Sequence, residues 1–189
     1  MNLYDGYDFS DQMEQLRLAE LLAATEPNRT DYQRDLSVSY ERMGDLLKTL
    51  GQAEQARQAY QRSLDIRERL AAAEPDRADY QRDLSVSFNK LGDLFRALGQ
   101  GEQARQAFQR SLDIAERLTA AEPDRADAAW DLVVSLYKVA QIDEDHNREL
   151  LSRALTILRR LYAAGSLYPN QVQAMEQLEE MLGAAEDGA

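Results

Sequence analysis

The residues best suited to chemistry lie between Asp143 and Asn147, where carboxylates surround His146, the only histidine of the chain. Carboxylate oxygens and an imidazole can bind a divalent cation, so this segment is a candidate metal site. It lacks the ligand spacing and the glycine of a calcium-binding loop. We therefore interpret it as a solvated turn and expect neither a metal nor another cofactor. The same interpretation applies to three acidic residues near the N-terminus, Asp5, Asp8 and Asp11.

Catalytic motifs are absent from the sequence. The chain has no cysteine, which excludes thiolate nucleophiles, thiolate metal sites and disulfides. The glycine-containing segment ALGQGEQA, residues 97–104, lacks the lysine of a phosphate-binding loop. No serine, lysine or pair of carboxylates is placed by a motif for nucleophilic or acid–base work. We therefore predict that the protein is not an enzyme.

The charge balance excludes further classes of partner. The 189 residues include 22 Lys and Arg against 34 Asp and Glu, so the formal net charge is -12. Such a chain repels nucleic acid and anionic membranes at long range. The N-terminal segment MNLYDGYDFSD has acids where a secretory signal has a basic start and an apolar run. We expect a cytoplasmic protein that binds neither nucleic acid nor membrane.

The elements that position these residues are repeated. The segment YQRDLSVSY at 32–40 returns as YQRDLSVSF at 80–88 and, weakly, as AAWDLVVSL at 128–136, so the interval is constant. Residues 26–73 align with 74–121 without a gap, and only 13 of the 48 positions differ. A tandem duplication of this length predicts a solenoid whose units stack on one another.

The pattern within each repeat predicts two helices. Apolar residues recur at steps of three and four, which predicts a first helix, helix A, that ends at Gly51. A second stripe, from Ala56 to Leu70, predicts helix B, which ends before Pro75 because proline cannot continue a helix. The stripe of helix A comprises Tyr32, Leu36, Tyr40, Met43, Leu47 and Leu50. The expected N-caps are Thr30 or Asp31, with Gln33 completing a capping box, and Asp79 in the second copy.

We predict one domain over residues 1–189. Its parts are a leading B-type helix at 9–25, repeats at 26–73 and 74–121, a degenerate repeat at 122–165 and a capping helix at 166–183.

The two middle copies resemble the tetratricopeptide repeat. The matching positions in the first copy are Tyr40, Met43, Gly44, Leu47, Ala56, Tyr60 and Ser63, and those in the second are Phe88, Leu91, Gly92, Phe95, Ala104, Phe108 and Ser111. The resemblance implies an all-α, right-handed α-α superhelix of about three helical hairpins. It also implies that the glycine and the alanine let helices A and B approach closely.

The length of the repeat departs from the family, whose usual period is about 34 residues. Repeats as long as these resemble those of long bacterial arrays, which are often attached to signalling NTPase or caspase-like protease domains. The resemblance to the tetratricopeptide repeat implies a scaffold that binds a protein or peptide. A regulatory or sensor part of such a signalling system and a small acidic secretion chaperone are the alternatives.

In this family, the face of helix A opposite its core stripe lines a concave groove. The corresponding residues are Arg34, Val38, Glu41, Asp45 and Lys48 in the first copy, Arg82, Val86, Asn89, Asp93 and Arg96 in the second, and Trp130, Val134 and Tyr137 in the third.

Two interpretations of this face remain open. In one, Trp130 and Tyr137 anchor a peptide while carboxylates such as Asp45 and Asp93 take its basic groups. In the other, the capping helix covers Trp130, and the charged positions are merely solvated. A partner's C-terminal carboxylate is disfavoured, because Glu41 and Asp45 stand where carboxylate-clamping relatives have Lys and Asn.

The leading helix has an apolar stripe, which includes Met13, Leu16, Leu21 and Leu22, and no helix A precedes it. A homodimer through this helix is therefore an alternative to a monomer.

Overall fold

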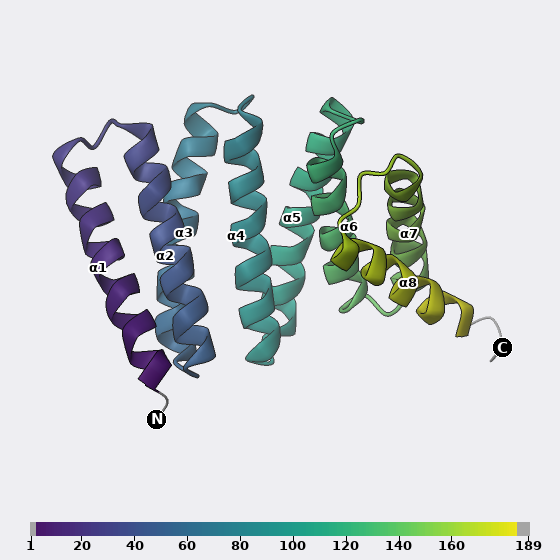
Figure 1. Cartoon of the computed structure of the whole chain (residues 1–189), viewed down its shortest axis with the longest axis horizontal. Helices are drawn as coiled ribbons and strands as arrows, with labels where there is room; N and C mark the ends of the chain where they lie inside the picture. Colours follow the sequence, from purple (N-terminus) through teal and green to yellow (C-terminus); the bar gives the residue numbers. More distant parts are fainter. Residues whose placement is uncertain (1–2, 185–189) are drawn as a thin grey trace. The chain divides into compact units, whose positions relative to one another are not determined.

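The computed structural model describes residues 3–184, and it describes the side chains of residues 9–183. Every helix or strand assigned within residues 3–184 is an α-helix (Figure 1). The chain divides into two compact units, Met1–Ala104 and Arg105–Ala189. The first unit contains α1 (Leu3–Thr25), α2 (Thr30–Thr49), α3 (Ala53–Ala73), α4 (Ala78–Ala97) and the first turn of α5 (Gly101–Ala121). The second contains the rest of α5, α6 (Ala126–Ala140), α7 (Asn147–Ala163) and α8 (Pro169–Ala184).

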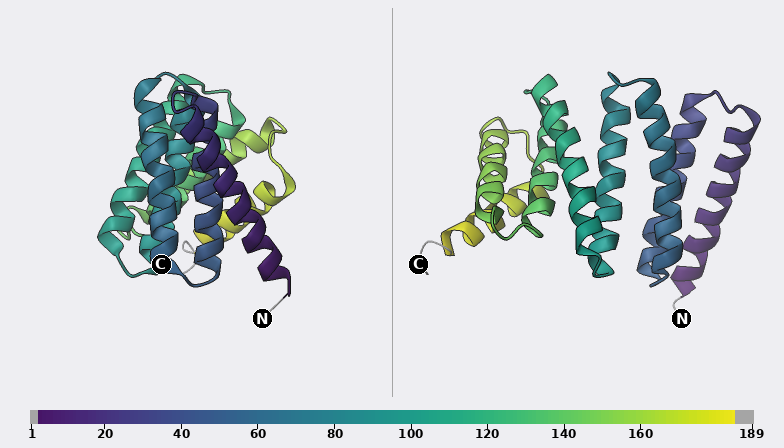
Figure 2. Two further views of the ribbon diagram at one scale, coloured as in Figure 1. Left: turned by 90° about the vertical axis from the view of Figure 1, so that its left-hand side faces the viewer. Right: turned by 180° about the vertical axis from the view of Figure 1, so that it is seen from behind.

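The helices of the first unit pack in chain order. Helix α1 packs on α2, α2 on α3, and α3 on α4, and the two opposite views of Figures 1 and 2 show the four side by side. A buried cluster from α3 and α4 joins the repeats, with half-buried side chains of α2 packed against it. The predicted all-α solenoid of helical hairpins is confirmed within each unit, whereas the assignment of the whole chain to one domain stays a prediction.

The predicted end of the first helix A is confirmed. Helix α2 ends at Thr49, and Gly51 takes a φ of 73°, which a residue with a side chain adopts only with strain. The N–H of Gln52 then donates to the carbonyl of Leu47 at 2.8 Å. This bond satisfies a carbonyl at the helix end and turns the chain toward α3. Helix α3 likewise ends at Ala73, two residues before Pro75.

Helices α2 and α3 approach closely at Gly44, as the repeat pattern implies. A Cβ atom at Gly44 would lie 2.6 Å from Cδ1 and Cε1 of Tyr60. Tyr60 is 1% exposed, and Ala56, one turn earlier on α3, is fully buried. The glycine therefore makes room for the tyrosine ring.

The predicted N-caps are wrong. Helix α2 begins at Thr30 and α4 at Ala78, so the capping positions belong to Arg29 and Arg77, and neither side chain makes a capping hydrogen bond. Asp31 and Asp79 lie inside the first turns. Each carboxylate there accepts a hydrogen bond from the guanidinium two residues earlier, at 3.1 and 3.0 Å.

The turn between α1 and α2 is closed by a contact that the capping-box prediction missed. The Nε2 of Gln33 donates to the carbonyls of Ala23 and Pro27, both at 3.3 Å.

Helix α1 begins at Leu3, six residues before the predicted start. It therefore extends beyond the segment that aligns with the later B helices.

The second unit ends with the predicted additional helix. Helix α8 packs on α7 and buries Met175 and Leu178. Arg159 of α7 and Glu179 of α8 form an ion pair at 2.8 Å. Between α5 and α6, the hydroxyls of Ser111 and Ser135 are hydrogen-bonded at 3.0 Å within the core.

The first turn of α3 gives a prediction about pH. Two donations from Arg57, at 2.6 and 2.9 Å, and one from Gln58 lower the pKa of Glu54 to about 2. Since the pKa is depressed in the folded state, these contacts are complete above the ordinary pKa of a glutamate and are lost as the pH falls toward about 2. We expect an NMR titration to show Glu54 ionised down to about that pH. In Arg57→Gln, its pKa should return toward 4.5, and an unchanged titration would contradict the assignment.

Candidate interaction surface

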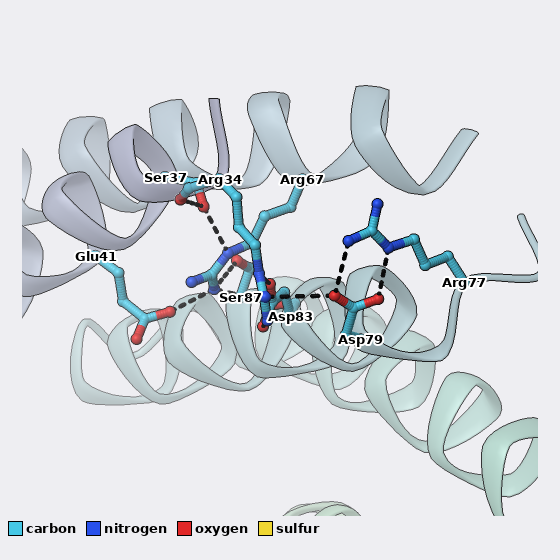
Figure 3. Close-up of polar contacts among 8 residues, drawn as sticks. All are labelled: Arg34, Ser37, Glu41, Arg67, Arg77, Asp79, Asp83 and Ser87. Atoms are coloured by element: carbon cyan, nitrogen blue, oxygen red, sulfur yellow. Dashed lines mark hydrogen bonds and ion pairs between the residues drawn. The ribbon is translucent and has the colours of Figure 1, made fainter. Parts of the chain in front are cut away.

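The predicted groove residues of the first unit lie on α2 and α4, and ion pairs link these helices. The Nε of Arg34 on α2 lies 2.6 Å from Oδ2 of Asp83 on α4, and its Nη1 lies 3.3 Å from Oδ2 of Asp79 (Figure 3). Arg77 holds Asp79 from the other side. Arg34, the first basic residue of the predicted groove, is therefore already paired with two carboxylates of α4.

A buried arginine on α3 joins three helices. The side chain of Arg67 is 4% exposed and forms an ion pair with Glu41 of α2. It also donates to Oγ of Ser37 at 3.2 Å, to Oγ of Ser87 at 2.8 Å and to the carbonyl of Asp83 at 3.0 Å (Figure 3). Because charged and polar acceptors surround Nε and Nη1, the buried charge of this guanidinium is paired inside the unit. Glu41 is therefore part of the packing between α2 and α3, in addition to any contact that it makes with a partner.

Sequence reasoning missed the role of Arg67, although a signal existed. Between the two copies, Arg67 becomes Ala115 and Glu41 becomes Asn89, so both charges disappear together. The joint loss of two opposite charges is what a contact between the two side chains would produce, and the structure shows that contact. The periodic pattern alone could not show it, because arginine is ordinarily an exposed residue.

Asp45 is the most accessible carboxylate that the structure fixes on this surface. Its oxygens accept hydrogen bonds from Nζ of Lys90 and from the hydroxyl of Tyr60, each at 2.7 Å, yet its side chain stays 44% exposed. Burial and the carboxylate beside the phenol raise the pKa of Tyr60, so its hydroxyl remains a donor. The carboxylate is held in place while one side faces solvent.

The other predicted residues of the first unit are half-buried or exposed. Lys48 and Arg96 are exposed, and Arg96 lies 3.8 Å from Asp93. Arg82 has interactions of its own. Oδ1 of Asn89 is buried and accepts no hydrogen bond from the part of the chain that the structure describes. The apolar members, Val38 and Val86, are half-buried.

The predicted aromatic residues belong to the second unit. Trp130, Val134 and Tyr137 are all half-buried on α6, while Val133 and Leu136 between them are buried. The structure therefore brings the three residues to one side of α6 with part of each ring or side chain accessible. The ten residues of α2 and α4 form a separate set.

The acidic segment after α6 forms a turn. Asp143 accepts a hydrogen bond from the backbone N–H of His146 at 3.2 Å, and its carboxylate lies 3.1 Å from Nδ1 of the same residue. The contact with the imidazole lowers the pKa of Asp143. Among the described residues, no group of three His, Cys, Asp or Glu side chains is arranged to hold a metal ion. The side chains of Asp5 and Asp8 lie outside the described residues, and Asp11 is exposed.

Comparison with protein families assigns the repeats. A family model described as tetratricopeptide repeat matches residues 35–117, which run from α2 into α5. These repeats belong to the tetratricopeptide family. Tetratricopeptide repeats bind proteins or peptides, and the chain is accordingly a protein-interaction scaffold in general terms.

Comparison with whole proteins adds little to this assignment. The crystal structure of BtubC (BKLC) from P. vanneervenii matches at 13% identity, covering 100% of this chain and 94% of that chain, with a TM-score of 0.38. No curated protein sequence matches this chain significantly. None of the helices between residues 3 and 184 is both long and apolar enough to cross a membrane.

Proposed function

We propose that the protein holds a basic peptide or helix on the α2–α4 surface of its first unit, with Asp45 as the central acceptor. The observation that supports this most is the carboxylate of Asp45, fixed by two donors and still 44% exposed. A fixed acceptor loses little entropy when it binds a cation. The formal net charge of -12 attracts a basic partner at long range.

The existing ion pair of Asp45 does not prevent such binding. Its partner Lys90 is one-third exposed, and exposed pairs of this kind contribute only about 0–1 kcal/mol. Lys90 reaches both oxygens of Asp45 from a single nitrogen, whereas a guanidinium forms two parallel bonds with a carboxylate from two nitrogens. An arginine of the partner would therefore displace Lys90 at small cost, while the half-buried Val38 and Val86 contact its apolar side chains.

In the second unit, we propose Trp130 and Tyr137 as anchors for apolar side chains of a partner. Both rings are half-buried, so each keeps accessible surface while its position is fixed by packing. Aromatic residues in this situation contribute a large share of binding energy at interfaces. The sensor and secretion-chaperone alternatives remain predictions from the resemblance alone.

Selection from a random peptide library displayed on phage tests this function. Peptides selected on the wild-type protein should be rich in Arg and Lys, and Asp45→Lys should bind them at least tenfold more weakly because like charges then meet. The matched control is Asp65→Lys on α3, an exposed site with the same charge change. Peptides without basic residues, or equal loss in both variants, would refute a role for Asp45. Trp130→Ala tests the second unit in the same assay.

A further inference from the structure

The interior of the first unit shows how one repeat stacks on the next. Ile66 of α3 is 5% exposed and packs in a cluster with Tyr80 of α4. Leu36 and Tyr40 of α2 and Leu84 of α4 pack against the same cluster. A B helix is therefore covered by two A helices, one from its own repeat and one from the next.

Helix α1 is a B helix that, within residues 3–184, packs on one of these two neighbours, α2. It aligns one repeat length before α3, so Leu18 stands in the place of Ile66 and Leu21 in the place of Arg69. Leu18 is 57% exposed and Leu21 is 61% exposed. Figure 1 shows α1 as the outermost helix of its unit, with α2 on one side only. Leu18 thus lacks the cover that Ile66 has, whereas Leu21, one helical turn later, stands at a position that is exposed in α3 as well.

The edge of α2 next to α1 has an acidic residue at a position where the next repeat forms an ion pair. Asp83 of α4 accepts the guanidinium of Arg34 at 2.6 Å. In the preceding copy, Asp35 of α2 stands in the place of Asp83 and is exposed. Its carboxylate has no side-chain partner among the described residues. The edge of α2 therefore presents a vacant acceptor for an arginine.

A donor accompanies this acceptor seven residues later. Lys90 of α4 donates to Asp45 of α2 at 2.7 Å. Arg42 stands in the place of Lys90 one copy earlier, is exposed, and has no partner within residues 9–183. The spacing of acceptor and donor on α2 is thus the same as on α4, where both are used.

We propose that this end face, formed by Leu18 and Leu21 of α1 with Asp35 and Arg42 of α2, binds an amphipathic helix of a partner protein that has the pattern of helix A. That pattern is an arginine, a leucine two residues later, an aromatic residue six later and an aspartate eleven later, as in Arg34, Leu36, Tyr40 and Asp45. The arginine pairs with Asp35 and the aspartate with Arg42. The apolar residues between them cover Leu18, and Leu21 lies at the edge of the contact.

A second folded copy of this chain does not offer such a helix. In α2, both Arg34 and Asp45 are already engaged by α4. In α4, the corresponding arginine and aspartate have interactions as well. At these two positions α6 has Trp130 and, as its C-cap, Gln141, so both charges are missing. The charge pattern therefore favours a different protein as the occupant.

One further position refines the partner. Ala19 of α1 stands in the place of Arg67, as Ala115 of α5 does one repeat later. The repeat that contains Ala115 has Asn89 where the first repeat has Glu41. An acidic residue in the partner at this position would be buried without its arginine. The best match is therefore a helix with a neutral residue there, as in α4.

A labelled synthetic peptide with the sequence of residues 77–98, which covers α4, is the probe. Fluorescence anisotropy should show it binding the full chain at one site. The peptide of residues 29–50 should bind more weakly, because it brings Glu41 against Ala19. Leu18→Glu should weaken binding of the first peptide by about tenfold or more, the factor expected when a leucine contact is lost. Asp35→Arg should weaken it too, and a peptide with Arg82→Asp should recover affinity for that variant.

Asp65→Arg, an exposed change of equal charge on α3, is the matched control and should leave binding unchanged. Equal affinity of the wild type and Leu18→Glu would overturn the proposal. So would a dimer in light scattering that Leu18→Glu dissociates, because a second copy would then occupy the face. Asp45→Lys should not alter peptide binding here, which separates failure of this proposal from failure of the α2–α4 function.

Discussion

Arg67→Ala is expected to lower the free energy of unfolding of the first unit by about 3 kcal/mol, the usual cost of removing one partner from a buried ion pair. The Arg67 side chain is 4% exposed. Its removal leaves the carboxylate of Glu41, two serine hydroxyls and the carbonyl of Asp83 without their donor. The penalty arises mainly from the charge of Glu41, which stays largely buried and unpaired.

The second copy of the repeat indicates how this loss can be repaired. There, alanine and asparagine replace Arg67 and Glu41 together, as Ala115 and Asn89. Arg67→Ala combined with Glu41→Asn should therefore lose only about 1 kcal/mol, because no buried charge remains. The two single variants and the double variant form a cycle with a coupling of about 2 kcal/mol or more.

Urea denaturation followed by circular dichroism measures the four stabilities. Hydrogen exchange should show the loss in α2, α3 and α4. Arg69→Ala, an exposed arginine on the same helix, is the control and should change stability by less than about 0.5 kcal/mol. A double variant as unstable as the sum of its singles would show that Arg67 and Glu41 act independently.

The hairpin architecture was predictable because its signals are local. The tandem repeat shows that each copy forms the same unit, and Gly51 and Pro75 end helices through their own backbone restrictions. The prediction of the N-cap residues was also wrong for a local reason. Arg29 and Arg77 bind the aspartates two residues later, and the sequence does not say that these arginines occupy the capping positions.

The candidate surface was less predictable, since it depends on which neighbour covers each side of a helix. A helical projection places Asp45 opposite the apolar stripe, but it cannot show that Lys90 of the next repeat reaches it. Identity between the copies also hides contacts, because Ser37, Asp83 and Ser87 are unchanged one repeat later. The joint loss of two opposite charges, at Arg67 and Glu41, is the sequence signal that is consistent with a contact.

Gly44→Ala is expected to lower the free energy of unfolding by about 2 kcal/mol, within the usual cost of overpacking a core. The new methyl group would lie 2.6 Å from two ring carbons of Tyr60. The ring has no room to withdraw, since Tyr60 is 1% exposed and its hydroxyl is bonded to Asp45 at 2.7 Å. Alanine is favoured over glycine in a helix by up to about 1 kcal/mol. The steric cost of the methyl group is therefore larger than the expected net loss of about 2 kcal/mol, by up to about 1 kcal/mol.

Gly101→Ala is the matched control, because the first copy has Ala53 at the same position and nothing lies within 4 Å of the new Cβ. It should leave stability unchanged or raise it slightly, since alanine favours the first turn of α5. Thermal unfolding followed by circular dichroism compares the two variants with the wild type. If Gly44→Ala unfolds at the temperature of Gly101→Ala, then α2 and α3 do not approach at Gly44. A lower temperature for Gly44→Ala alone would show that this glycine is retained for the space that Tyr60 requires.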